Sequence, residues 1–170
     1  MLDKILNRRN IERSIVAVER NAGAGGVDDR QSDELRPFVN ADCQGLLNSI
    51  REGRYQPSPV RQVEIPKATG GVRVLGIPTV VDRMIQQAIY QVLSPIFEGI
   101  FGNHSYGFRP GKNAHHAVLK AQEYLNEGYN WIIEFDLEKF FDKVNHQKLL
   151  HLVSLQVKDR DTLLLINSFL

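Results

Sequence analysis

The chain has 170 residues, of which 42% are hydrophobic and 24% charged, and its formal net charge is +1 at pH 7. This length suits one ordinary domain or two small lobes, and the composition indicates a soluble globular protein. No apolar run approaches the roughly 18 residues of a membrane span, and no apolar signal segment begins the chain. The single cysteine, Cys43, excludes an internal disulfide, so we expect a cytoplasmic protein without a membrane partner.

Residues 10–22 predict a first helix with Asn10 as its N-cap. The glycine-rich loop, GAGGVDD at 23–29, follows it. This loop lacks the preceding strand and the terminal Gly-Lys-Ser/Thr of a phosphate-binding loop, so a flexible connection is favoured over a phosphate cradle. A second helical region is predicted over residues 33–53, with Ser32 as its cap.

A β-hairpin is predicted next, because two alternating runs rich in β-branched residues flank the turn ATGG at 68–71. Lys67 lies at the end of the first run and Arg73 near the start of the second. The hairpin would bring these two cations close together, where they could bind a phosphate chain. An ordinary solvated hairpin tip is the alternative.

A long helix follows the hairpin, and Pro95 should end or kink it. The irregular GNHSYGFRPGKN at 102–113 mixes aromatic residues with Arg109 and Lys112, which is typical of a nucleic-acid contact. Between residues 54 and 112, seven basic residues stand against three acidic ones, a local net charge of +4. Such a surface suits a polyanion, although a normally mixed surface is an open alternative.

After a helix capped by Asn113, the strand WIIEFD is predicted at 131–136. Asp136 ends this apolar strand, where a carboxylate is costly unless a cation, backbone N–H groups or a metal ion offsets it. A two-metal phosphoryl-transfer site needs such a carboxylate, and the next carbonyl, of Leu137, can also face the ion. Phe141 would then lie over the sugar that is attached to the phosphate. A capping aspartate is the alternative.

Three blocks occur in the order RQVEIPKATGGVRVLGIPTVVDRMIQQAI, HSYGFRPGKNAHHA and FDLEKFFDKVNH. Together they closely resemble the reverse transcriptases that group II introns encode, which also act as maturases. NAGAGGVDD resembles the N-terminal extension of the same family, so the resemblance covers residues 10–170. It implies an α+β fold: the fingers and the first part of the palm of a right-hand polymerase, mostly helical with a β-hairpin and a palm strand.

The implied division of the chain is an N-terminal extension with the glycine-rich loop over 1–35, fingers over 36–125 and the beginning of a palm over 126–170. Asp136 resembles the first catalytic ligand of Mg2+, with the Leu137 carbonyl as a second. Phe141 resembles the sugar gate, and Phe140 lies beside it in the nucleotide pocket. The incoming triphosphate would be bound by two finger cations, Lys67 and Arg73. RNA and template contacts are expected from four further residues, Arg61, Arg83, Arg109 and Lys112.

The resemblance implies an Mg2+-dependent RNA-directed DNA polymerase and intron RNA-binding maturase. Its partners would be intron RNA, an RNA template with a DNA primer, and deoxynucleoside triphosphates. The family's palm also carries an adjacent pair of aspartates, but the Asp-Asp sequence here is Asp28–Asp29 in the glycine-rich loop. A thumb is missing as well, and apolar residues run to Leu170.

We therefore expect a fragment of a longer enzyme, which binds RNA but does not complete catalysis. Apolar surface left open in such a fragment would favour a homodimer. Two alternatives remain: a non-catalytic RNA-binding module, and a related reverse transcriptase that serves diversity generation or CRISPR adaptation.

Overall fold

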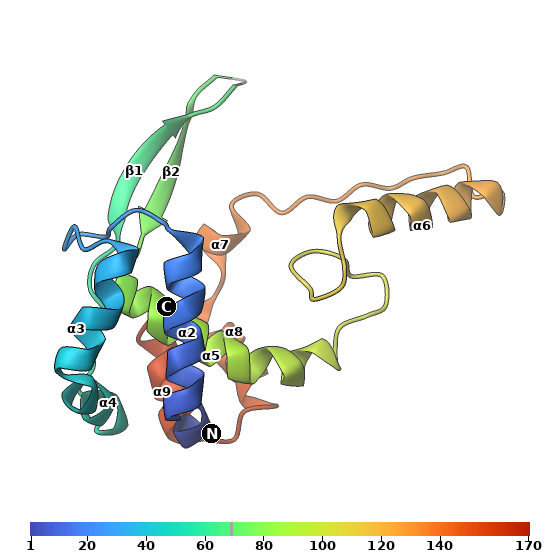
Figure 1. Ribbon diagram of the computed structural model, residues 1–170. Coiled ribbons are helices and arrows are strands. Elements are labelled where there is room, and N and C mark those ends of the chain that lie inside the picture. Colours follow the sequence, from blue (N-terminus) through green and yellow to red (C-terminus); the bar gives the residue numbers. More distant parts are fainter. Residues whose placement is uncertain (69) are drawn as a thin grey trace. The chain divides into compact units, whose positions relative to one another are not determined.

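The computed structural model describes residues 1–68 and 70–170. The chain forms two compact units: residues 1–93 with 146–170 make the first unit, and residues 94–145 make the second. Helices dominate, and strands β1 (Arg61–Pro66) and β2 (Val72–Ile77) form an antiparallel hairpin (Figure 1). The prediction of a mostly helical chain with a β-hairpin is thus confirmed. Within the described residues, no helix has the length and hydrophobicity that crossing a bilayer requires.

The first unit is built mainly from helices. Their bounds are α1 (Leu2–Ile5), α2 (Arg8–Asn21), the 3-10 turn η1 (Ser32–Glu34), α3 (Leu35–Ala41), α4 (Cys43–Arg51), α5 (Val80–Glu98, which continues into the second unit), α8 (His146–Ser154) and α9 (Arg160–Asn167). The N-cap of α2 is Asn7, and the predicted cap Asn10 instead donates to the carbonyls of Ile5 and Ala88 at 2.8 and 3.0 Å. Ser32 opens η1, whose capping residue is Gln31. The predicted cap of the first helix is therefore wrong by three residues, and that of the second helical region by one.

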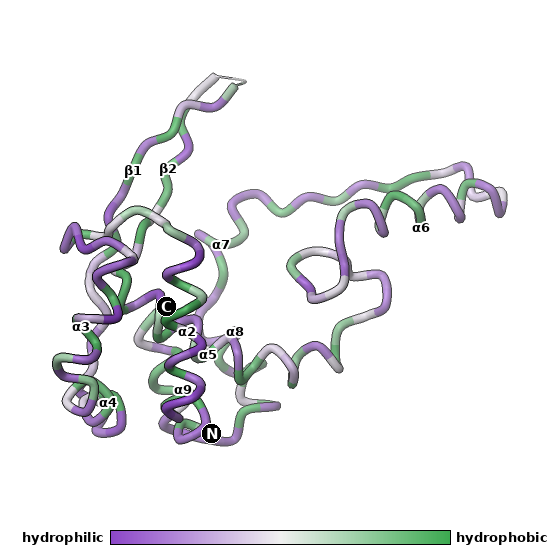
Figure 2. The backbone as a smooth tube through the Cα atoms, in the orientation of Figure 1, coloured by the Kyte–Doolittle hydropathy of each residue, from purple (hydrophilic) through white to green (hydrophobic). Residues whose placement is uncertain are grey.

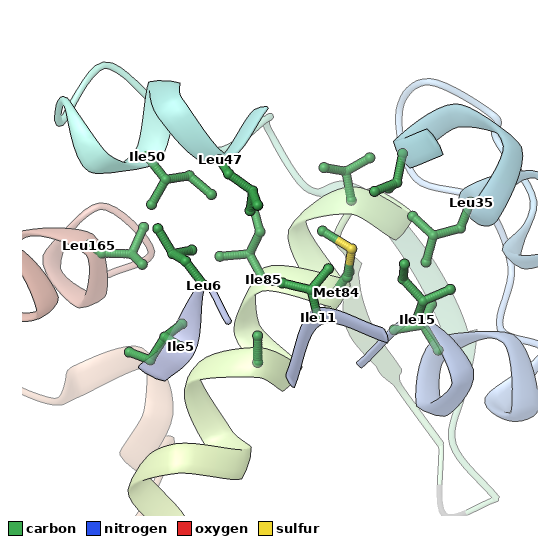
Figure 3. Packing of buried hydrophobic residues seen from close by; sticks show 14 of the residues in the cluster. Ile5, Leu6, Ile11, Ile15, Leu35, Leu47, Ile50, Met84, Ile85 and Leu165 are labelled. Carbon is green, nitrogen blue, oxygen red and sulfur yellow. The ribbon is translucent and has the colours of Figure 1, made fainter. Parts of the chain in front are cut away.

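The core of the first unit lies around the start of α5. Met84 and Ile85 of α5 are fully buried, and Figure 3 shows them among apolar side chains of α1, α2, α3, α4 and α9. Each helix contributes residues at helical spacing, so one apolar stripe per helix is enough to close the core. Asp82 is buried in the same turn of α5, with 1% of its surface exposed.

The hairpin has the predicted position and turn. Arg61 pairs with Ile77 and Ile65 pairs with Arg73, and both strands contain hydrophilic and hydrophobic residues (Figure 2). The backbone of Lys67 exchanges hydrogen bonds with the turn, accepting from Gly70 at 3.1 Å and donating to Gly71 at 3.0 Å. Both glycines have φ near +85°, a conformation that favours glycine, and Thr69 of the predicted turn lies outside the described residues.

The second unit contains the end of α5, with Pro95 inside the helix, then α6 (Ala114–Asn126) and α7 (Phe140–Lys143). Asn113 caps α6 as predicted, because its side chain accepts from the backbone N–H of His116 at 3.0 Å. The predicted palm strand at 131–136 is wrong, since this segment has no regular secondary structure. A strand needs a partner for its backbone hydrogen bonds, and the described residues of this unit offer none.

Candidate active site and nucleic-acid interface

The face of the hairpin that carries Arg61 also carries Arg73. Residues that pair directly across an antiparallel ladder point to the same side, so Arg61, opposite Ile77, and Arg73, opposite Ile65, share one face. Lys67 follows β1 at the turn, and all three cations are exposed. Among the described residues, neither Lys67 nor Arg73 forms an ion pair. The tip of the hairpin therefore presents cationic side chains whose charge is not neutralised locally.

Arg61 is engaged within the chain. Its Nη1 donates to Oδ1 of Asp29 at 2.6 Å, and this ion pair joins the root of the hairpin to the glycine-rich loop. The two side chains are 49% and 80% exposed, so water screens the pair and its contribution to stability is small. A phosphate group could replace Asp29 at this arginine without a large loss of stability.

Arg83 holds the other side of the same loop. Its Nη2 donates to the carbonyl of Ala24 at 2.7 Å, while its buried Nε has no hydrogen-bond partner within the described structure. Burial lowers the pKa of Arg83, and the nearby Asp28 acts in the opposite direction. A Cβ on Gly23 would lie 2.5 Å from Arg83 Nη1. The expectation of a flexible connection is therefore wrong: the loop is packed onto the start of α5.

Gly26 allows the glycine-rich loop to approach the start of α5 closely. A Cβ at that position would lie 2.7 Å from both the backbone nitrogen and the Cα of Thr79, atoms that cannot move without shifting the start of α5. We expect Gly26→Ala to lower the free energy of unfolding by about 2 kcal/mol, the usual cost of overpacking. Urea denaturation measures this loss.

The matched control is Gly107→Ala, where a Cβ would meet no atom within 4 Å. Its urea midpoint should equal that of the wild type. A midpoint for Gly26→Ala that is also unchanged would show that the loop does not pack as described.

Arg109 organises the loop at 102–113 in the second unit. Its guanidinium donates to both carboxylate oxygens of Glu98 at 2.7–3.2 Å and to the carbonyls of Gly102 and Ser105 at 2.7 and 2.9 Å. The Arg109 side chain is 8% exposed, and its hydrogen bonds to the Glu98 carboxylate lower the pKa of Glu98. Lys112 donates to the carbonyl of Asn103 at 3.0 Å. Arg109 and Lys112 therefore hold the loop together, and the same two side chains would make the predicted RNA contacts.

Asp136 and its neighbours lie in the second unit. The side chains of Asp136 and Leu137 are exposed, and Phe140 contacts Phe141 edge to face with ring centroids 5.5 Å apart. The side chain of Phe141 is 85% exposed. No group of three or more potential metal ligands occurs in the part of the chain that is described.

The donor set at this position suits Mg2+ in kind. Mg2+ prefers oxygen ligands and binds through one or two carboxylates together with substrate phosphates and water. Asp136 offers one carboxylate, and the adjacent Leu137 offers a carbonyl in an irregular segment without ladder hydrogen bonds. Further ligands would have to come from the nucleotide and from elsewhere in a longer protein.

Sequence reasoning missed two residues that the structure singles out. Buried Asp82 accepts a hydrogen bond from the Tyr55 hydroxyl, a partner that no local pattern predicts. The spacing Thr79–Asp82 is a capping signal that could have marked the carboxylate. Phe108 is fully exposed at φ +55°, an unusual conformation for an aromatic residue, and lies next to Arg109.

Comparison with known proteins identifies relatives that are longer than this chain. Protein YkfC of Escherichia coli K12 is 36% identical over 149 residues, which are 85% of this chain and 39% of that protein. Group II intron-encoded protein LtrA of Lactococcus lactis subsp. cremoris is 35% identical over 152 residues, 89% of this chain and 25% of that protein. Nuclear intron maturase 1, mitochondrial, of Arabidopsis thaliana is 27% identical over 161 residues, covering 95% and 21%. The chain thus spans well under half the length of each of these three relatives.

The family profile described as reverse transcriptase (RNA-dependent DNA polymerase) matches residues 65–170, more than half of the chain. This range contains the second hairpin strand, the loop that Arg109 organises, and the segment of Asp136 and Phe141. Together with the relatives named above, it confirms the predicted resemblance to group II intron reverse transcriptases. The protein therefore belongs to the reverse transcriptase (RNA-dependent DNA polymerase) family.

Proposed function

We propose that this chain is part of an RNA-directed DNA polymerase of the group II intron type, and that it contributes fingers and the beginning of a palm. The proposed division is an N-terminal extension over 1–35, fingers over 36–125 and palm from 126 onward. The observation that carries the proposal is the family match over residues 65–170, because this range includes Asp136 and Phe141. The names of the relatives support the intron type, since one is an intron-encoded protein and another an intron maturase.

In this proposal the hairpin binds the incoming triphosphate. Lys67 and Arg73 are exposed cations without ion-pair partners among the described residues, and together they can neutralise phosphate charge. Arg73 shares its face with Arg61, so a nucleic-acid phosphate that displaces Asp29 would meet the same cationic face. Arg83 acts at one remove, because it holds the glycine-rich loop through the Ala24 carbonyl. Arg109 and Lys112 hold the loop at 102–113 and would also contact the RNA phosphates.

The reacting end of the nucleotide would be held by the segment around Asp136. Mg2+, when bound, would act as a Lewis acid on the phosphates and lower the barrier to attack by the primer 3′-OH. The residues of this chain that would hold it are the Asp136 carboxylate and the Leu137 carbonyl. The ring of Phe141, supported by Phe140, would exclude a 2′-hydroxyl from the sugar position.

A second function has support in the charge pattern. The net charge of +4 between residues 54 and 112 suits RNA binding without catalysis, as expected of a maturase that recognises structured intron RNA. The two functions are compatible, because a polymerase also binds RNA. Primer extension separates them: the longer protein should extend a DNA primer on an RNA template with deoxynucleotides and Mg2+. RNA binding without extension of any primer would support only the binding function.

Phe141→Val in the longer protein should relax the choice between deoxyribonucleotides and ribonucleotides. Removing the ring opens space for the 2′-hydroxyl, so we expect the ratio of kcat/KM values to fall by roughly a hundredfold, the usual limit of discrimination by a pocket wall. Single-nucleotide incorporation with each sugar measures this ratio. Phe38→Val, at a 44% exposed position of the first unit, is the control and should leave the ratio unchanged. Unchanged selection in Phe141→Val would remove the gate role.

A further inference from the structure

Little fixes the direction of the hairpin except the two chain segments at its base. Every described side chain of β1 and β2 is exposed or half-buried, so little hydrophobic packing fixes the strands against the helices of the first unit. Figure 1 shows the hairpin extending beyond those helices. A two-stranded hairpin of this kind is only marginally ordered by itself. Whatever fixes the chain segments at its base therefore determines where its cations lie.

One buried carboxylate joins both of these segments. Oδ1 of Asp82 accepts from the Tyr55 hydroxyl at 2.6 Å, and Oδ2 accepts from the backbone N–H of Ser58 at 3.2 Å. Both donors lie on the segment that leads into β1. Oδ2 also accepts from the hydroxyl of Thr79, two residues beyond the end of β2, at 2.6 Å. Asp82 thus bonds to the chain on each side of the hairpin.

The surroundings of Asp82 make this junction stiff. The residue is 1% exposed and Thr79 is 3% exposed, so water does not compete for the hydrogen bonds. The Thr79 hydroxyl also accepts from the Asp82 backbone N–H at 3.2 Å, which completes a cap at the start of α5. Tyr55 packs against the core and contacts Phe169 with ring centroids 6.4 Å apart. The anchor is therefore part of the rigid core rather than of the surface.

We propose that Asp82, acting through Tyr55 and Ser58, is a positioning residue that fixes the direction of the hairpin and thereby places Lys67 and Arg73 at the nucleotide. The second half of this statement rests on the proposed polymerase function, while the first half does not. A role in helix capping alone would need only Thr79 and the start of α5. The hydrogen bond from Tyr55 is the feature that capping does not explain.

The test is a distance measurement on the full 170-residue chain. Spin labels are placed at two exposed positions of the first unit, Val16→Cys in α2 and Val72→Cys in β2, in a Cys43→Ser background. Tyr55→Phe removes one hydroxyl and keeps the packed ring, and Asp82→Asn weakens all three bonds. Both should broaden the distribution of distances between the labels. If Asp82→Asn does not fold, Tyr55→Phe alone decides.

The matched control is Ser14→Ala, which removes another buried hydroxyl, one that donates to the Ile11 carbonyl within α2. Its distance distribution should equal that of the parent. A distribution in Tyr55→Phe as narrow as that of the parent would overturn the proposal.

In the longer protein, Tyr55→Phe should raise KM for deoxynucleotides about fivefold with little change in kcat, the scale of one charge-assisted hydrogen bond partly lost. If the longer protein extends primers and this KM does not change, the link to nucleotide placement is wrong. If it extends no primer at all, the proposed function fails, while the distance measurement still decides whether Asp82 directs the hairpin.

Discussion

Replacing Asp136 with asparagine in the longer protein should reduce RNA-templated primer extension by at least about a thousandfold. Asparagine keeps the shape of the side chain but loses the negative charge that a divalent cation requires. A metal ion contributes several kcal/mol of charge stabilisation in the transition state, and about 4 kcal/mol corresponds to a factor of a thousand. Extension under single-turnover conditions measures the loss directly.

The same variant should bind RNA as the wild type does, because Asp136 is an exposed anion that holds no other group of the described chain. Asp142→Asn is the matched control: it removes an exposed carboxylate six residues away, in α7, and should retain extension. Activity in Asp136→Asn close to that of Asp142→Asn would refute the assignment of the metal ligand.

RNA binding by the 170-residue chain should weaken about a hundredfold between 50 and 200 mM salt. If about five basic side chains contact phosphates, the released counterions give a slope of about −3.5 in log K against log salt for single strands. The candidates are the exposed hairpin cations together with the basic residues of the loop at 102–113. A titration of a fluorescent intron RNA at several salt concentrations yields the slope.

Arg73→Gln should reduce the magnitude of this slope by about 0.7, since it removes one phosphate contact. Arg51→Gln, an exposed arginine of α4 outside the proposed interface, should leave the slope unchanged. An affinity that does not depend on salt over this range would contradict an electrostatic RNA interface.

The hairpin could be predicted because its signals are local. Alternating residues define the two strands, and Gly70 and Gly71 supply the positive φ values of the turn. The cap of α6 was local in the same way, since Asn113 needs only the N–H of His116. Residues a few positions apart in sequence determine these features, so the sequence alone is sufficient to find them.

The structure of residues 131–136 could not be predicted in the same way, because a strand depends on a partner that is distant in sequence. Trp131 is 95% exposed and Phe135 is 89% exposed, so the apolar residues that indicated a buried strand are not covered in this chain. An apolar sequence pattern predicts buried side chains correctly only where another element of the fold covers them.

Some contacts of the candidate site also could not be predicted from the sequence. A count of charges suggested that Arg61, Arg83, Arg109 and Lys112 face RNA, but it could not show that each already has an acceptor within the chain. Arg83 binds the Ala24 carbonyl, 59 positions away, and Tyr55 reaches Asp82 across 27 positions. Such contacts depend on how the helices pack, which no local pattern encodes.

The most direct test of the central claim, that Asp136 holds a catalytic metal ion, is to map the metal position chemically. Fe2+ replaces Mg2+ in the longer protein bound to an RNA template, a DNA primer and a deoxynucleotide, and ascorbate then generates radicals that cleave nearby backbone. We predict cleavage within residues 135–142 that excess Mg2+ suppresses and that Asp136→Asn abolishes. Cleavage confined to other segments, or unchanged in Asp136→Asn, would contradict the account.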